Sequence, residues 1–71
     1  METLMHERLH QLAAGQLWKL EHGYLHIVDL GKRLIYYKML RTPTQRAAIT
    51  QMIGIEALLR YLRQNEAQLV A

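Results

Sequence analysis

The sequence contains no cysteine and no serine, and it has a single proline. The absence of cysteine excludes disulfide bonds and thiolate-ligated metals as sources of stability. Without serine or cysteine, two of the usual side-chain nucleophiles are missing, and none of the threonines has a neighbouring base motif. We therefore expect no enzyme activity, no catalytic residue, no cofactor and no small-molecule substrate.

Long apolar runs are also lacking, and the longest are short stretches such as residues 34–37. None of them approaches the length that a membrane-spanning helix requires. The first residues have neither the basic start nor the apolar centre of a secretory signal. These absences favour a cytoplasmic protein that has no membrane partner.

The chain is short, with 71 residues, and we expect one small domain over residues 1–71. Its 51% hydrophobic and 21% charged residues are typical of a folded domain. A chain of this size has a thin core, and small domains are commonly stabilised by disulfides, a metal or a partner subunit. Because disulfides are excluded, a partner subunit is the first expectation.

Three apolar runs rich in β-branched and aromatic residues occupy the middle of the chain, separated by Gly23 and Gly31. Short runs of this kind, punctuated by glycine, are typical of an antiparallel β-meander. The expected meander spans residues 16–40, with strands over residues 16–21, 24–30 and 33–40.

The second and third of these strands carry apolar side chains at successive positions, so both of their faces are apolar. Simple alternation places Leu25 and Ile27 on one face and Leu30 on the other. A large apolar face left open on a monomer would be anomalous. We therefore expect a homodimer, joined through the sheet face, the sheet edge or the C-terminal helix.

Helical spacing is found on both sides of the meander. Met5, Leu9 and Leu12 share one helical face, which predicts a helix over residues 1–14. Ile55 and the leucines that follow it at helical spacing predict a second helix over residues 53–68.

The connecting residues 41–52 contain the only proline and are expected to form a loop, within which residues 45–52 suit either a short fourth strand or an early helix start. The predicted fold is thus α+β: an N-terminal helix, a three-stranded antiparallel meander and a C-terminal helix. The alternative is an SH3-like small barrel with flanking helices.

One short motif has known metal chemistry, the H-E-x-x-H pattern from His6 to His10. On a helix, this spacing places both histidines on one side, where they can ligate zinc. The match covers five residues, and Arg8 places a cation beside the supposed metal. The favoured interpretation is two histidines at the boundary of an amphipathic helix, and zinc binding by His6 and His10 is a distant alternative.

A basic and aromatic segment is the second feature with possible chemistry. Basic side chains neutralise phosphates, and a neighbouring aromatic ring stacks on an unpaired base. The net charge of +3 is only mildly basic, so a protein partner is favoured over nucleic acid. The candidate interaction residues are Trp18, Arg33, Tyr36, Tyr37, Lys38, Arg41 and Arg46.

The residues Gly15-Gln-Leu-Trp18, with the runs 23–28 and 34–37, resemble small bacterial and phage-type proteins. These proteins have a Gly-x-hydrophobic-Trp opening, two further strands and a closing helix. The resemblance implies a small α+β or SH3-like sheet, and it implies no activity. The function favoured by the sequence is a non-enzymatic, self-associating protein-interaction module, with nucleic-acid binding as the alternative.

Overall fold

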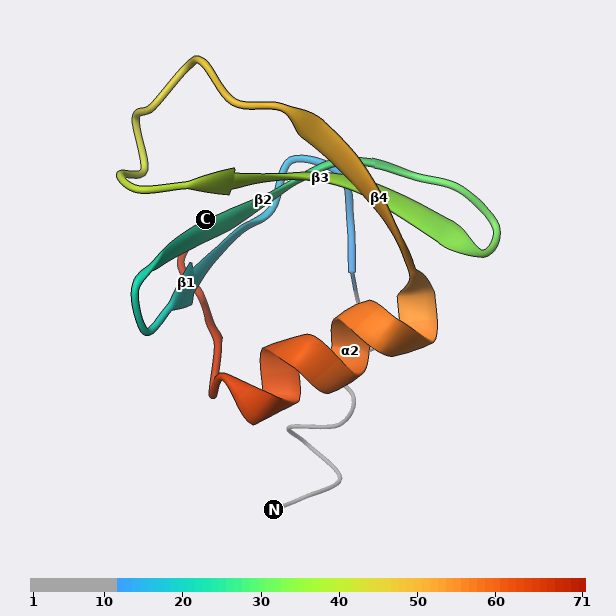
Figure 1. Cartoon of the computed structure of the whole chain (residues 1–71). Helices are drawn as coiled ribbons and strands as arrows, with labels where there is room; N and C mark the ends of the chain where they lie inside the picture. The colour runs from blue at the N-terminus through green and yellow to red at the C-terminus, as the bar shows by residue number, and fades with distance from the viewer. Residues whose placement is uncertain (1–11) are drawn as a thin grey trace.

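The computed structural model describes residues 12–71, which form one five-stranded antiparallel sheet and one α-helix (Figure 1). The strand order is β4-β3-β2-β1-β5, so the chain forms a meander from β1 to β4 and returns to the free side of β1 with β5. The elements are β1 (Leu17–Leu20), β2 (Gly23–Leu30), β3 (Leu34–Leu40), β4 (Thr50–Gly54), α2 (Ile55–Gln64) and β5 (Gln68–Leu69).

The start of β2 requires a glycine. Tyr24, the second residue of β2, pairs with Leu40 at the end of β3, and this brings Gly23 close to the same backbone. A Cβ on Gly23 would lie 2.6 Å from the carbonyl oxygen of Leu40. Because a backbone atom cannot move away cheaply, only glycine fits here.

A β-bulge interrupts the pairing of β2 with β3. The register shifts between Ile27 and Asp29, so Val28 is the extra residue. One extra residue reverses the inside-outside alternation for the rest of the strand. Leu30 therefore packs against the core, on the same side as Leu25. The prediction that Leu30 lies on the opposite face from Leu25 and Ile27 is wrong for this reason.

The core lies between one face of the sheet and α2. The sheet curves around the helix (Figure 1), and we call the face toward α2 the inner face and the opposite one the outer face. Apolar residues at helical spacing give α2 one buried side, as the sequence predicts. The buried cluster consists of Trp18, Leu20, Leu25, Ile27 and Ile35 from the sheet and Leu58, Leu59 and Leu62 from α2.

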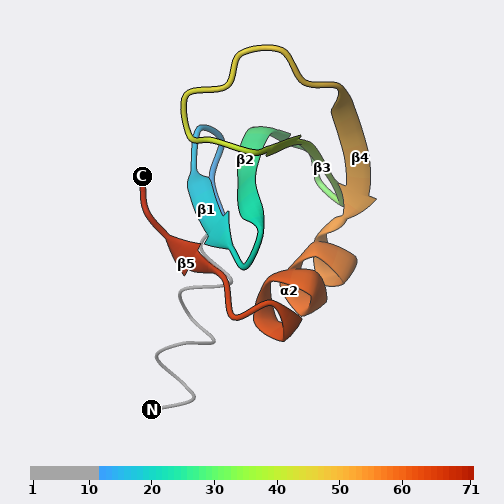
Figure 2. The ribbon, with the colours of Figure 1, turned by 60° about the vertical axis from the view of Figure 1, so that its left-hand side comes forward.

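The helix ends earlier than predicted. The side-chain amide of Asn65 donates a hydrogen bond to the carbonyl oxygen of Tyr61 at 2.8 Å, and Glu66 adopts a left-handed φ of 49°. A residue in this conformation does not continue an α-helix, so the chain turns and forms β5 beside β1 (Figure 2). No helix in the described part of the chain is long and apolar enough to cross a membrane.

The predicted fold needs correction in its number of strands and helices. The described residues form five strands and one helix rather than a three-stranded meander between two helices, because β4 and β5 pair with the two free sides of that meander. The alternative, an SH3-like barrel with flanking helices, is also wrong, because the described residues contain one helix and their sheet ends at β4 and β5 without closing.

Two segments of the prediction have different outcomes. Most of the helix predicted over residues 1–14 lies outside the described residues, and residues 12–14 form a loop and the start of a turn. Of the two alternatives for residues 45–52, the short fourth strand is the one found, as β4.

Candidate interaction surface

The strand β4 lies at one end of the sheet and has a strand partner on one side only. It pairs with β3 over its whole length, from Thr50 opposite Lys38 to Gly54 opposite Leu34. Within residues 12–71, no strand pairs with the other side of β4. We call this open side, together with the side chains of Ile49 and Met52, the β4 edge.

One hydrogen bond at the end of β4 shows which backbone groups of this strand point to its open side. The N–H of Ile55 donates to the carbonyl oxygen of Arg33 at 3.0 Å. Hydrogen-bonded and non-hydrogen-bonded pairs alternate along an antiparallel ladder. Ile53 therefore also faces β3, whereas Thr50 and Met52 direct their N–H and C=O groups to the open side.

Natural sheets commonly protect an open edge with charges, proline, a bulge or a very short strand. The sequence of β4 is Thr-Gln-Met-Ile-Gly, which has no charge and no proline, and its pairing with β3 has no bulge. At the other end of the sheet, β5 is only two residues long. The β4 edge is thus the longer and less protected template for another strand.

Apolar side chains add to this edge. Ile49 is 81% exposed and Met52 is 61% exposed, the highest values among the large hydrophobic residues of the described chain. Met52 lies on the outer face beside half-buried Tyr36 of β3. An added strand on this side would therefore cover apolar side chains as well as pair with backbone groups.

The outer face brings two of the predicted interaction residues together. Tyr36 and Lys38 are two positions apart on β3, so their side chains share this face. Lys38 lies between His26 of β2 and Thr50 of β4. Lys38 and His26 are half-buried, and Thr50 is exposed. An aromatic ring and a cation thus lie next to each other on β3, one strand in from the β4 edge.

The predicted arginines do not form one patch. Arg33 comes directly before β3, Arg41 comes directly after it, and Arg46 lies in the connection to β4. All three are exposed. Because Arg33 precedes β3 and Arg41 follows it, the basic segment of the sequence is divided between the two ends of this strand.

Two other predicted interaction residues lie on the inner face. Trp18 is 3% exposed, is part of the core and donates a hydrogen bond through Nε1 to Oε1 of Gln16 at 3.1 Å. Tyr37 packs against the core and donates its hydroxyl to Oε1 of Gln51 at 3.3 Å. Trp18 therefore has a structural role, and Tyr37 connects β3 to β4.

The metal hypothesis rests on His6 and His10, which lie outside the described residues. Among residues 12–71, no group of three or more His, Cys, Asp or Glu side chains is placed to hold a metal ion.

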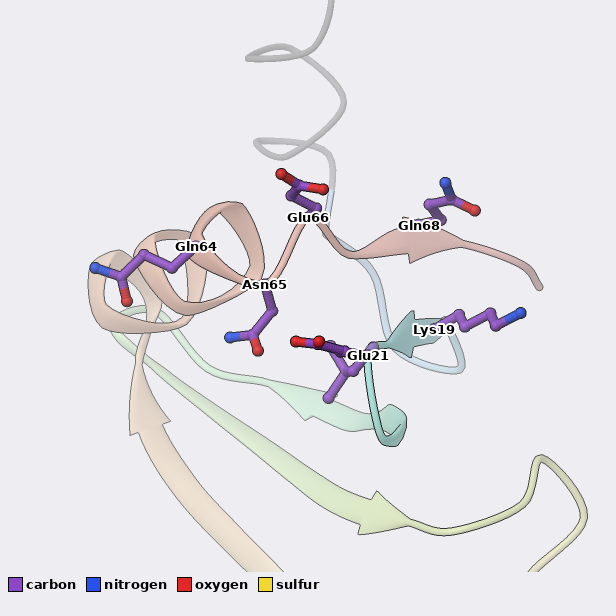
Figure 3. Close-up of a pocket in the computed structure, with 7 residues that line it drawn as sticks. Lys19, Glu21, Gln64, Asn65, Glu66 and Gln68 are labelled. Atoms are coloured by element: carbon purple, nitrogen blue, oxygen red, sulfur yellow. The ribbon is translucent and has the colours of Figure 1, made fainter.

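A hollow with a volume of about 590 Å³ lies between the end of β1 and the α2–β5 connection (Figure 3). In Figure 3, Asn65 and Glu21 point toward one another, whereas the side chains of Gln64 and Gln68 point in other directions. The polar groups therefore do not converge on one ligand position, and this hollow is a weaker candidate than the β4 edge. Its lining residues are Lys19, Leu20, Glu21, Gln64, Asn65, Glu66 and Gln68.

No protein-family model, curated protein or solved structure matches the chain. The likeness to bacterial and phage-type proteins stays an interpretation of strand and turn signals.

Sequence reasoning did not identify Ile49 and Met52 as candidates. The signal that points to them is the uncharged run from Ala47 to Ile55, which includes the whole of β4. A strand without charged residues lacks one of the features that protect an edge strand against pairing with another strand.

Proposed function

We propose that this protein is a small, non-enzymatic protein-interaction module that associates with itself through the β4 edge. The observation that carries the proposal is the open side of β4, where Thr50 and Met52 direct backbone N–H and C=O groups away from β3. Strand addition satisfies such groups and is a common mode of protein recognition. A second copy supplies a strand of the same length and the same lack of charge.

Two further features support self-association. Pairing covers the exposed side chains of Ile49 and Met52, and burial of apolar area stabilises an interface by about 25 cal/mol per Å². The chain is also short, and a partner subunit adds to the thin core that a small domain builds alone. Most soluble oligomers are symmetric dimers that use one patch twice.

The experiment is size-exclusion chromatography with light scattering at a series of protein concentrations. The proposal predicts a mass that rises from that of one chain to that of two as the concentration increases. A mass of one chain at every concentration contradicts it.

A second candidate function is the binding of single-stranded nucleic acid to the outer face. It is supported by the adjacency of Tyr36 and Lys38, because a base can stack on the ring while the ammonium group contacts a phosphate. Anisotropy of a labelled oligonucleotide tests it. Binding that weakens steeply with salt and is lost in Tyr36→Ala supports this function, and no binding at low salt removes it.

A further inference from the structure

The ladder geometry also constrains how two copies meet. Building on the proposed self-association, we infer that β4 pairs antiparallel with β4 of a partner subunit, in the register that places Met52 opposite Met52 of the partner subunit. This register is the symmetric one that pairs all five residues of β4.

The direction of the backbone groups agrees with this register. Thr50 and Met52 both face the open side, and outward-facing residues must lie opposite each other in an antiparallel pair. With Met52 on the two-fold axis, the two Met52 residues exchange their N–H and C=O groups. Thr50 then lies opposite Gly54 of the partner subunit.

The side chains of β4 do not oppose self-pairing. Residues 50–54 carry no charge, so no like charges meet across the two-fold axis. The two Met52 side chains meet on the outer face, each beside a half-buried Tyr36. Methionine is flexible and polarisable, and it adapts to a contact with its own copy and with an aromatic ring.

In the same register, the residues that precede β4 in one copy lie beside the first turn of α2 in the other copy. Ile49, which is 81% exposed, comes opposite half-buried Ile55 of the partner subunit. Continued past β4, the register places Glu56 of the partner subunit, an acidic residue in the first turn of α2, opposite Ala48 and two residues from Arg46, so the long arginine side chain comes near this carboxylate. Both charged side chains are exposed, and their signs are complementary. A second copy thus fits the edge in apolar contact and in charge.

A charge exchange tests the register in the full-length chain, with the dimer dissociation constant measured by sedimentation equilibrium. Arg46→Glu and Glu56→Arg alone are each expected to weaken the dimer by at least about threefold. The double variant restores the affinity, because the pair is re-formed with its signs exchanged. Arg41→Glu is the matched control, since Arg41 is an exposed arginine of the same connection at the far end from β4, and it is expected to change the affinity little.

A spin label provides a second measurement that does not depend on charge. Because the chain has no cysteine, Met52→Cys gives a single attachment site. The proposed register predicts strong dipolar broadening in the dimer, which disappears when labelled chain is diluted with unlabelled chain. Leu69→Cys, on β5 at the other end of the sheet, is expected to show none.

The outcomes separate the register from the proposed function. A dimer that shows neither rescue by the double variant nor broadening at position 52 overturns the register and leaves self-association standing. A chain that stays monomeric overturns both.

Discussion

The two ends of the sheet differ in the length of backbone that they leave open. At one end, β5 has two residues, and the next residue, Val70, donates a hydrogen bond to the carbonyl oxygen of Leu17 at 2.9 Å. At the other end, β4 offers five residues without charge or proline. A very short edge strand is itself a protection against further pairing, and β4 lacks this protection.

Exposed apolar side chains alone do not distinguish these two ends. Leu69 is 50% exposed at the β5 end, and Met52 is 61% exposed at the β4 end. What differs is the number of backbone groups available beside them. The longer open ladder, more than the exposed apolar side chain, therefore makes the β4 edge the better template for the proposed partner strand.

The largest expected effect comes from removing a donor on the β4 edge. Met52→Pro deletes an outward N–H and leaves the β3 ladder intact, because the N–H of Met52 points away from β3. We expect the dimer dissociation constant to rise by about 100-fold, or about 2.7 kcal/mol. Sedimentation equilibrium measures the constant, and circular dichroism checks that the fold is kept.

The matched control is Leu69→Pro on β5. The bond from Val70 to Leu17 and the alternation of the ladder direct the N–H of Leu69 to the open side. We expect its dimer affinity to match that of the unaltered chain. Equal losses in the two proline variants would show that the two edges do not differ as described.

Removal of residues 68–71 tests whether β5 stabilises the fold without contributing to the dimer. Trp18 loses its neighbour Leu69, and Leu17 loses its hydrogen bonds to Val70 and Ala71. We expect the free energy of unfolding to fall by about 2 kcal/mol, measured by chemical denaturation at one fixed protein concentration. The dimer affinity is expected to stay unchanged. An unchanged free energy of unfolding, by contrast, would mean that β5 contributes nothing to the stability of the fold.

A charge placed at each edge gives a smaller contrast. Met52→Lys puts two like charges across the proposed two-fold axis, and like charges directly opposite each other are destabilising. We expect a dimer about tenfold weaker, with part of the affinity recovered at high salt. Leu69→Lys, which adds the same charge at the other edge, should change the affinity by less than about twofold, and the idea fails if both lysines act alike.

The smallest expected effect concerns a side-chain hydrogen bond that joins β4 to β3 in addition to the backbone ladder. Tyr37→Phe removes the exposed hydrogen bond from Tyr37 to Gln51. We expect a loss of about 0.5 kcal/mol in the free energy of unfolding, measured by thermal denaturation. The dimer affinity should be unchanged, because Gln51 is on the inner face, and a large drop would mean that this bond positions the edge.

The central strands and α2 follow from local sequence pattern. Glycine punctuation predicts β1 to β3, the alternation puts Trp18 and Leu20 together, and the helical spacing after Ile55 predicts α2. The bulge at Val28 and the strand β5 do not follow. Each is decided by pairing with a strand elsewhere in the chain, and two residues are too few to carry a local signal.

The candidate site is predictable only in part. Alternation correctly separates Tyr36 from Tyr37, but which of the two faces meets α2 depends on where the helix packs. Trp18 is a predicted interaction residue, and it lies in the core. Met52 is not predictable as a candidate, because the sequence of residues 45–52 suits a strand or a helix, and only a strand has an open edge.

The most direct measurement is amide hydrogen exchange, resolved by residue and followed over a range of protein concentrations. If the β4 edge pairs with another copy, the N–H of Met52, which faces the open side of β4, exchanges more slowly as the protein concentration rises. The N–H of Leu69, on the open side of β5, should exchange rapidly at every concentration. Rapid exchange at Met52 at all concentrations would contradict the claim that the β4 edge pairs with another copy.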